Sequence, residues 1–242
     1  METRPRPVHA LLVVLSLLGG VAAAAAAPPA AAVPPDLIAH RGVPAAAKDW
    51  SFLPFADQGA WFGFALPLSD TLDGGFSGPF VHAAGRWASA SMARLQIRDR
   101  STDAAIVFTE TKSVALPGLL RRSSTADGLR LDLELWFDDR RTALVRAHLQ
   151  ATGAREVSLA WTGSVFADQA TWAIGERHVV ARSIPTAERS AGSASGWRLR
   201  LDSDRPATAT VDRDTYRLDL GSIELPAETS VELVLAMRRG NE

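Results

Sequence analysis

Residues 129–137 alternate between apolar and mostly polar side chains, and no other feature constrains the fold of this chain as much. Leucine occupies every odd position from 129 to 135 and phenylalanine occupies 137, whereas the even positions hold Arg, Asp, Glu and Trp. Successive side chains of a strand point to opposite faces, so this segment would have one apolar and one polar face. The pattern predicts a half-buried strand of an antiparallel sheet.

The same period of two recurs along the chain. It is found at Leu95–Ile97, Val157–Trp161, Trp197–Leu201, Leu218–Leu220 and Val231–Met237. A polar turn at residues 138–141 predicts a hairpin, residues 168–176 fit either a short helix or a loop, and residues 190–196 form a Gly/Ser-rich connection. A spacing of about 10 to 15 residues between successive predicted strands favours a sandwich over a βαβ fold. We therefore predict an all-β fold, an antiparallel β-sandwich of the two-sheet supersandwich type.

The N-terminus predicts export. Arg4 and Arg6 precede an apolar run at residues 11–18, and small residues follow up to Ala27, which is typical of a secretory signal peptide. An uncleaved anchor is the alternative. We expect a signal peptide at residues 1–27, a Pro/Ala linker at 28–36, one domain at 37–240 and a periplasmic or secreted location, with no membrane contact after cleavage.

Composition narrows the classes of partner and cofactor. The chain has 26 basic and 27 acidic residues, so no charge footprint for nucleic acid or an anionic membrane is visible. It has no cysteine, so no disulfide framework can form. No zinc-type histidine spacing, P-loop or dinucleotide fingerprint occurs. We expect no cofactor and no metal.

Residues 50–80 are unusually rich in aromatic residues and glycine. They hold six of the nine Phe residues, together with Gly59, Gly63, Gly74, Gly75 and Gly78. These glycines suit positive φ angles or close approach of another backbone. One interpretation is a core segment of two hairpins. The other is an aromatic surface that meets a sugar or another domain.

Several motifs in this stretch resemble a known family. Residues 55–63 read FADQGAWFG and are followed by Leu66-Pro67 and by GGFSG at 74–78. Matching segments continue at 95–99, 113–120, 133–137, 141–144 and 157–163. Over residues 38–166 the chain resembles the N-terminal domain of bacterial glycoside hydrolase family 63 enzymes, which are glucosidase-type and act on α-linked oligosaccharides. Phe62 stands where that family often has a histidine.

This resemblance implies a role outside catalysis. In the family, the catalytic carboxylates lie in an (α/α)₆ barrel that follows the sandwich. The resemblance implies a non-catalytic domain in α-glucoside or oligosaccharide metabolism, which braces a barrel that is absent from this chain or encoded separately. The isolated chain would then not hydrolyse glycosides. The alternatives are a stand-alone exported carbohydrate-binding module, which binds oligosaccharide, and a complete enzyme with its site in the sandwich.

Candidate site residues come mainly from the aromatic stretch. We expect no catalytic residue, although chance pairs among the acids, such as Asp70, Glu110 and Asp138-Asp139, could face each other at the spacing that a glycosidase needs. The candidates for substrate binding or a domain interface are Asp57, Trp61, Phe62, Asp73, Phe76 and Trp136.

Other motifs have simpler interpretations. Ile38–Gly42 reads IAHRG and resembles the first strand of glycerophosphodiester phosphodiesterases. The residues that follow this motif in that family are absent here, so we expect a lead-in segment, which only enters the fold. Trp87, Trp161, Trp172 and Trp197 could be sugar platforms, with the core the expected place for Trp161 and Trp197. The pairs at 202/204 and 212/214 fit turns rather than a calcium loop.

Overall fold

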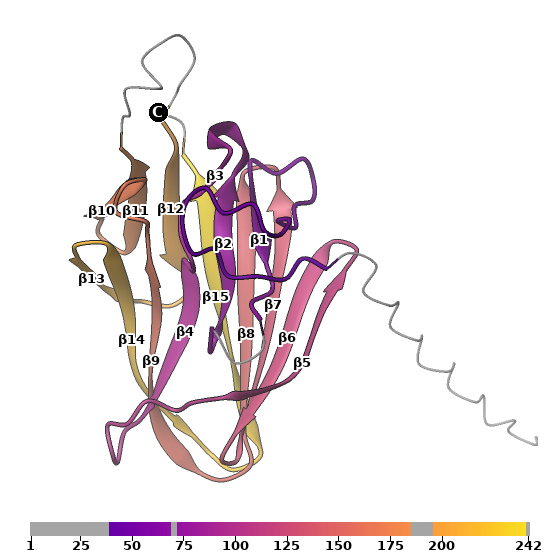
Figure 1. Cartoon of the computed structure of the whole chain (residues 1–242). Helices are drawn as coiled ribbons and strands as arrows, with labels where there is room; N and C mark the ends of the chain where they lie inside the picture. The colour runs from indigo at the N-terminus through magenta and orange to yellow at the C-terminus, as the bar shows by residue number, and fades with distance from the viewer. Residues whose placement is uncertain (1–38, 69–71, 185–195, 241–242) are drawn as a thin grey trace, which may run out of the picture. The chain divides into compact units, whose positions relative to one another are not determined.

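A computed structural model describes residues 39–68, 72–184 and 196–240 of the chain. These residues belong to one compact unit, Pro35–Glu242. They form fifteen strands and one short 3₁₀ helix, η1 (His82–Ala84), and the strands make two antiparallel sheets (Figure 1). The predicted all-β sandwich is therefore confirmed. Within the described part of the chain, no helix has the length and apolarity that crossing a membrane requires.

The first sheet has seven strands. Its order is β1-β2-β4-β9-β14-β13, and β3 pairs with β2. The strands are β1 (Phe62–Ala65), β2 (Gly75–Val81), β3 (Arg86–Trp87), β4 (Ala93–Asp99), β9 (Arg155–Ser164), β13 (Thr208–Asp212) and β14 (Thr215–Leu225).

The second sheet has eight strands in the order β10-β11-β12-β15-β8-β7-β6-β5. The strands are β5 (Thr109–Leu116), β6 (Leu119–Ala126), β7 (Leu129–Asp139), β8 (Thr142–Ala151), β10 (Ala170–Ile174), β11 (His178–Ser183), β12 (Arg198–Ser203) and β15 (Thr229–Arg239). β7 and β8 form the predicted hairpin.

The core follows the alternation of the sequence. On β7 each odd-numbered residue from Leu129 to Phe137 is at most 5% exposed, and these side chains join one cluster that draws on both sheets. Trp161 and Trp197 are buried, as predicted. Trp87 and Trp172 are buried too, so the prediction of sugar platforms is wrong for them. Both indoles point inward, where each donates a hydrogen bond to a backbone carbonyl.

Residues 168–176 differ from the prediction. They hold strand β10, which pairs with β11 from Ala170↔Ser183 to Ile174↔Val179. Ala170 and Trp172 are buried while Thr171 is exposed, so a period of two was present but too short to stand out. The predicted connection at residues 190–196 lies, except for Gly196, outside the described residues.

The glycines of residues 50–80 act as the sequence predicts. Gly59, Gly74 and Gly78 have positive φ, and Gly63 and Gly75 lie where a Cβ atom would meet backbone oxygens at 2.8 Å. Gly74 combines both constraints, since its φ is +70° and the Leu95 carbonyl oxygen would lie 2.3 Å from an added Cβ. The Gly-Gly pair therefore lets the start of β2 lie directly against β4.

Arg41 and His40, from the phosphodiesterase-like motif, have structural partners. The Arg41 guanidinium donates to the Ser113 hydroxyl at 2.5 Å and to the Ser113 carbonyl at 2.7 Å. His40 Nδ1 lies 3.2 Å from the carbonyl oxygen of Leu53. These contacts tie residues 40–41 to β5 and to the loop before β1, which agrees with the expected lead-in segment.

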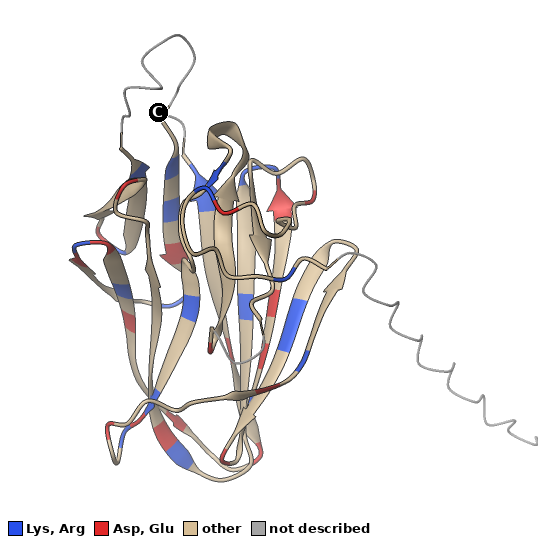
Figure 2. Ribbon diagram, viewed as in Figure 1, with Lys and Arg blue, Asp and Glu red and all other residues tan. Residues whose placement is uncertain are grey.

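Charged residues of both signs are interspersed over the strands (Figure 2). On the outer face of the eight-stranded sheet, Glu134 lies between Arg121 and Arg146 in one cross-strand row. Both arginines form ion pairs with Glu134, the Arg121 pair at 3.6 Å. Exposed pairs of this kind contribute about 0–1 kcal/mol each, so they orient surface side chains more than they stabilise the fold.

Candidate functional site

Trp61 is the candidate that lies on the surface, immediately before β1. It is 38% exposed. Its backbone N–H donates to the Arg140 carbonyl in the β7–β8 turn, and its carbonyl accepts from His82 N–H, each at 3.0 Å. The Arg239 guanidinium carbon, at the end of β15, lies 4.1 Å from the centre of the indole. This is cation–π geometry, so the indole has a fixed orientation while remaining accessible.

Trp50 and Leu53 extend this exposed region. They are 66% and 65% exposed, which is unusual for large apolar side chains. The Trp50 ring packs edge-on against Phe80 at 5.6 Å, and Phe80 packs against His82 at 5.3 Å. Because His82 N–H donates a hydrogen bond to the Trp61 carbonyl, Trp50 is linked to Trp61 through Phe80 and His82. We call Trp50, Leu53 and Trp61 the apolar end surface. Large apolar side chains that are exposed to water are candidates for an interaction site.

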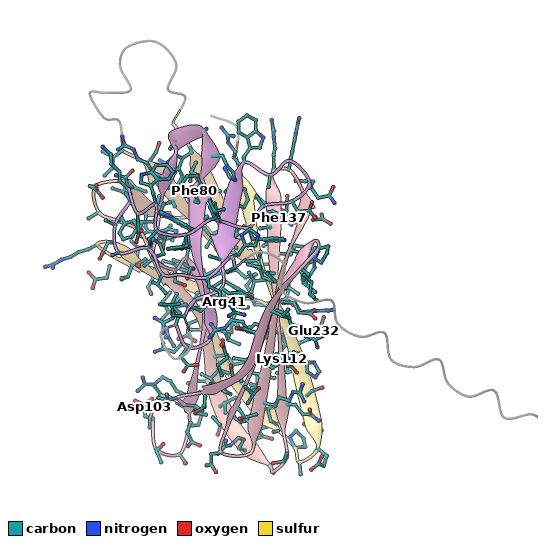
Figure 3. The ribbon with its side chains drawn as sticks, turned by 45° about the vertical axis from the view of Figure 1, so that its right-hand side comes forward. Arg41, Phe80, Asp103, Lys112, Phe137 and Glu232 are labelled. Atoms are coloured by element: carbon teal, nitrogen blue, oxygen red, sulfur yellow. The ribbon has the colours of Figure 1, made fainter. Side chains whose placement is uncertain are left out.

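Phe62 and Phe76 are core residues, which corrects their place among the surface candidates. They are 1% and 0% exposed. The Phe62 ring lies 6.0 Å from that of Phe64 and 5.9 Å from that of Phe137, in a cluster that joins β1 to β7. In Figure 3, Phe80 and Phe137 lie toward the same end of the strands. Of these two adjacent residues, Trp61 therefore has its ring at the surface and Phe62 has its ring in the core.

Trp136 is half-buried on the outer face of β7, the polar face that the sequence assigned to it. The Arg146 guanidinium lies 5.7 Å from its ring centre. Leu144 is its cross-strand partner on β8 and is also partly exposed. Trp136 thus belongs to the outer face of the eight-stranded sheet.

The two candidate carboxylates have separate environments. Asp57 lies in a turn before β1, and its Oδ1 accepts a hydrogen bond from Gln58 N–H at 2.7 Å. Asp73 lies before β2, and its Oδ2 accepts from Phe108 N–H at 3.1 Å. Burial raises the pKa of the Asp73 carboxyl, against the opposing effects of Phe108 N–H and of Arg94 and Arg122. The structure therefore assigns these acids to loop anchoring and does not bring them together. Asp70 lies outside the described residues.

The raised pKa of Asp73 predicts a pH-dependent effect on stability. The folded state holds this proton more tightly than the unfolded chain does, so the contribution is full below the unfolded pKa and is lost as pH rises through the folded pKa. Asp73→Asn removes this titration. The free energy of unfolding of Asp73→Asn minus that of the parent should therefore rise between pH 3 and pH 7. The rise should be less than about 1 kcal/mol, since the Asp73 carboxyl is half-exposed. Urea unfolding at several pH values measures it.

Asp99 supplies a control of opposite sign. Hydrogen bonds from the Ser101 hydroxyl and N–H lower the pKa of the Asp99 carboxyl, so its contribution is present above the unfolded pKa and lost as pH falls through the folded pKa. Asp99→Asn should accordingly lose stability relative to the parent as pH rises. The same trend in both variants would contradict the assignment for Asp73.

A buried ionic network escaped the sequence analysis. Arg122 is 3% exposed and forms an ion pair with Glu110 at 2.7 Å, and Glu110 also accepts from the Ser113 hydroxyl at 3.0 Å. Arg122 further donates to the carbonyls of Leu72 and Gly75 in the opposite sheet. The signal was available, because Arg122 shares the inward face of β6 with Leu120 and Ser124.

The remaining acids and histidines form no obvious reaction centre. Among the described residues, no group of three or more His, Asp or Glu side chains could hold a metal ion. Asp202 lies in β12, not in a turn, and pairs with Arg200 and Arg238. Asp212 is the last residue of β13, and Asp214 lies in the β13–β14 turn, where the predicted turn is confirmed.

A hollow of about 950 Å³ lies near the β6–β7 turn, toward the end of the strands where Figure 3 labels Asp103. Two of its carboxylates, Asp99 and Asp127, lie 3.6 and 3.7 Å from Arg155. An inverting glycosidase needs one carboxyl that stays protonated. Because the pKa of Asp99 is lowered, Asp99 is not suited to be the carboxyl that stays protonated.

These features define a class: an antiparallel β-sandwich with an exposed apolar surface at one end and no recognisable catalytic centre among the described residues. Residues 40–232 match the family described as glucosidase YgjK, N-terminal. The match spans more than half of the chain, and the chain belongs to this family.

One solved structure agrees with this chain at the level of the fold, and a second is reported beside it. A polysaccharide lyase superposes with a TM-score of 0.51 and 11% identity, over 75% of this chain and 33% of its own. A protein described as a kojibiose phosphorylase, from the human microbiome, gives a TM-score of 0.49 and 10% identity, over 76% of this chain and 26% of its own. This chain therefore spans about a quarter to a third of those proteins, and at 11% identity the likeness to the lyase is one of fold alone.

Proposed function

We propose that this chain is the non-catalytic N-terminal β-sandwich domain of a family 63-like glycoside hydrolase, and that it braces a catalytic (α/α)₆ barrel supplied by another segment or chain. The family match over residues 40–232 carries the proposal. The described residues contain strands and η1 but no α-helix, so a helical barrel would have to come from elsewhere. The pathway would be α-glucoside or oligosaccharide metabolism, in the periplasm or outside the cell.

The apolar end surface is the proposed docking site for the barrel. Trp61 is held by Arg239 and by the β7–β8 turn, so little side-chain freedom is lost when it is covered. Pre-ordered aromatic side chains are typical of the few residues that dominate an interface. Trp50 and Leu53 add exposed apolar area beside it. Covering these groups would remove an apolar patch that is otherwise exposed to water.

The first experiment reads the genome directly downstream of codon 242. A reading frame of (α/α)₆ type, in frame or one frameshift away, would supply the partner. Co-expression should then give a complex with this chain that survives size-exclusion chromatography. An unrelated neighbour would remove this support for the bracing role. It would favour a stand-alone carbohydrate-binding module, for which exposed Trp50 and Trp61 are suitable platforms and α-glucan pull-down is the measurement.

Trp61→Ala tests the docking surface in that complex. We expect binding to the barrel to weaken at least tenfold, because a covered aromatic anchor commonly contributes more than about 1.4 kcal/mol. Val107→Ala is the matched control, since Val107 is 76% exposed but lies outside the apolar end surface. Titration of the barrel with each variant measures the effect, and equal affinities would place the interface elsewhere.

We also expect the isolated chain not to hydrolyse maltose or other α-linked disaccharides. The candidate carboxylates Asp57 and Asp73 are committed to separate loop contacts and do not converge. Release of glucose, measured over long incubations, is the readout. Turnover that disappears when a carboxylate of this chain is replaced would sink the prediction and make the chain an enzyme in its own right.

A further inference from the structure

The outer face of the seven-stranded sheet carries a groove whose floor is β9. Between residues 158 and 162 the outward side chains of β9 are small, namely Ser158, Ala160 and Thr162. Longer polar side chains stand on both sides of this floor. They are Arg94, Gln96 and Arg98 on β4 and Arg217 and Asp219 on β14. Since neighbouring strands are only about 4.8 Å apart, a small-residue strand between two such strands forms a groove, which we call the β9 groove.

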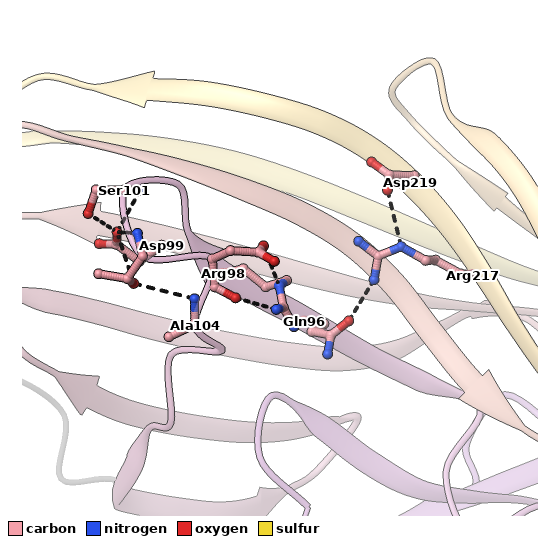
Figure 4. A network of polar contacts seen from close by, with 9 residues as sticks. Gln96, Arg98, Asp99, Ser101, Ala104, Arg217 and Asp219 are labelled. Carbon is pink, nitrogen blue, oxygen red and sulfur yellow. Dashed lines mark hydrogen bonds and ion pairs between the residues drawn. The ribbon is translucent and has the colours of Figure 1, made fainter.

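Two hollows lie along the β9 groove, with volumes of about 550 and 390 Å³. Arg217 lines both. Its Nη1 donates to Gln96 Oε1 at 2.6 Å across β9, and its Nε donates to Asp219 Oδ2 at 3.1 Å (Figure 4). Gln96 and Asp219 both pair with Ala160 in the ladder, so the smallest floor residue lies in their cross-strand row. Arg217 is therefore held in a fixed position between the two hollows.

Among the described residues, Arg94 is the arginine of the β9 groove that no carboxylate holds at ion-pair distance, although the Asp73 carboxylate interacts with it from further away. Its stem lies over Gly75, where an added Cβ would come within 2.4 Å of Arg94 Cγ, and its Nε donates to the Asp73 carbonyl at 3.3 Å. Arg98 and Arg217 each have a carboxylate partner, Asp103 at 3.0 Å and Asp219 at 3.1 Å. Among the described side chains, no carboxylate forms an ion pair with Arg94.

We propose that the β9 groove binds an acidic glycan, with a sugar carboxylate held by Arg94 and Arg217. These two arginines flank Thr162 in one cross-strand row. Guanidinium groups bind carboxylates through paired, charge-assisted hydrogen bonds. The hydroxyls of Ser158 and Thr162 and the amide of Gln96 supply donors and acceptors for sugar hydroxyls. Tyr216, the one aromatic residue lining either hollow, is only 3% exposed, so stacking of neutral sugars has no platform.

The position of β9 within the sheet favours a glycan over an acidic peptide. β9 pairs with β4 on one side and with β14 on the other, so its backbone groups are already used in the ladders. A peptide could not add to it as a further strand. Recognition must therefore come from the side chains of the groove, whose hydroxyl, amide and guanidinium groups suit a hydroxyl-rich acidic ligand. This site is distinct from the apolar end surface, and binding would not require a catalytic barrel.

The test uses the full chain after signal cleavage and titrates it with oligogalacturonate by calorimetry at low salt. The matched ligand is the same oligomer with its carboxyls methyl-esterified, which keeps the sugar chain and removes the charge. We expect binding of the acid and at least tenfold weaker binding of the ester. Absence of binding to the acid, or equal affinity for both ligands, would overturn the proposal.

Variants then assign the contact. Arg94→Gln and Arg217→Gln should each weaken acid binding at least tenfold, and Arg94→Lys should recover only part of the loss because it keeps the charge without the planar fork. Arg121→Gln, on the outer face of the other sheet, is the control and should bind as the parent does. An equal loss in Arg121→Gln would reveal attraction to the charge of the whole protein and contradict a site at the β9 groove.

Discussion

Arg122→Met is expected to lower the free energy of unfolding by about 3–5 kcal/mol, as is typical when one partner of a buried ion pair is removed. Methionine nearly matches the length of the arginine stem but removes every donor. Glu110, only 8% exposed at its side chain, would keep a buried charge without its cation. The carbonyls of Leu72 and Gly75 would lose a donor that reaches them from the opposite sheet. Urea unfolding followed by tryptophan fluorescence measures the loss.

Two further variants separate the ion pair from packing. In Arg122→Met with Glu110→Leu, no unpaired charge remains, so a large part of the lost stability should return. Arg121→Met, the next residue along β6 but exposed, should change stability by less than about 1 kcal/mol. A loss below about 1 kcal/mol in Arg122→Met itself would mean that water reaches the pair and that its role in joining the sheets is minor.

Most of the fold could be predicted because period-two patterns report directly on half-buried strands. Leu129 to Phe137 needed no tertiary information, since each side chain obeys the local rule. β10 was missed because only Ala170 and Trp172 mark its inner face. Sheet order could not be predicted at all. β14 pairs with β9 and β15 with β8, and such long-range pairings depend on the packing of whole sheets.

The candidate site was predicted only in part, for a physical reason. Trp61 and Phe62 are adjacent and both aromatic, so the sequence cannot tell which ring faces water until the direction of β1 is known. The ring cluster with Phe64 and Phe137 decides it, and Trp61 is left outside. Trp50 was inside the aromatic stretch but was not singled out, although its exposure exceeds that of Trp61. The β9 groove was invisible because its walls come from β4 and β14, far apart in sequence.

The glycine pair at the start of β2 was predicted correctly because backbone constraints are local. Gly74 has φ of +70°, a region that costs side-chain-bearing residues roughly 1–2 kcal/mol. The atom that an added Cβ would meet is the carbonyl oxygen of Leu95, at 2.3 Å. This oxygen belongs to the backbone of β4, and Gly74 itself accepts a hydrogen bond from Leu95 N–H at 2.8 Å. Neither strand can therefore shift without loss of their contact.

Gly74→Ala should accordingly lower the free energy of unfolding by about 2–5 kcal/mol, the sum of φ strain and the cost of forcing atoms into a filled space. Gly59→Ala is the matched control, because its φ is +65° but no atom lies within 4 Å of the added Cβ. It should lose only about 1–2 kcal/mol. Denaturant unfolding of the two variants isolates the close approach of β2 and β4. Equal losses would show that backbone conformation alone requires glycine, and that contact with Leu95 relaxes without cost.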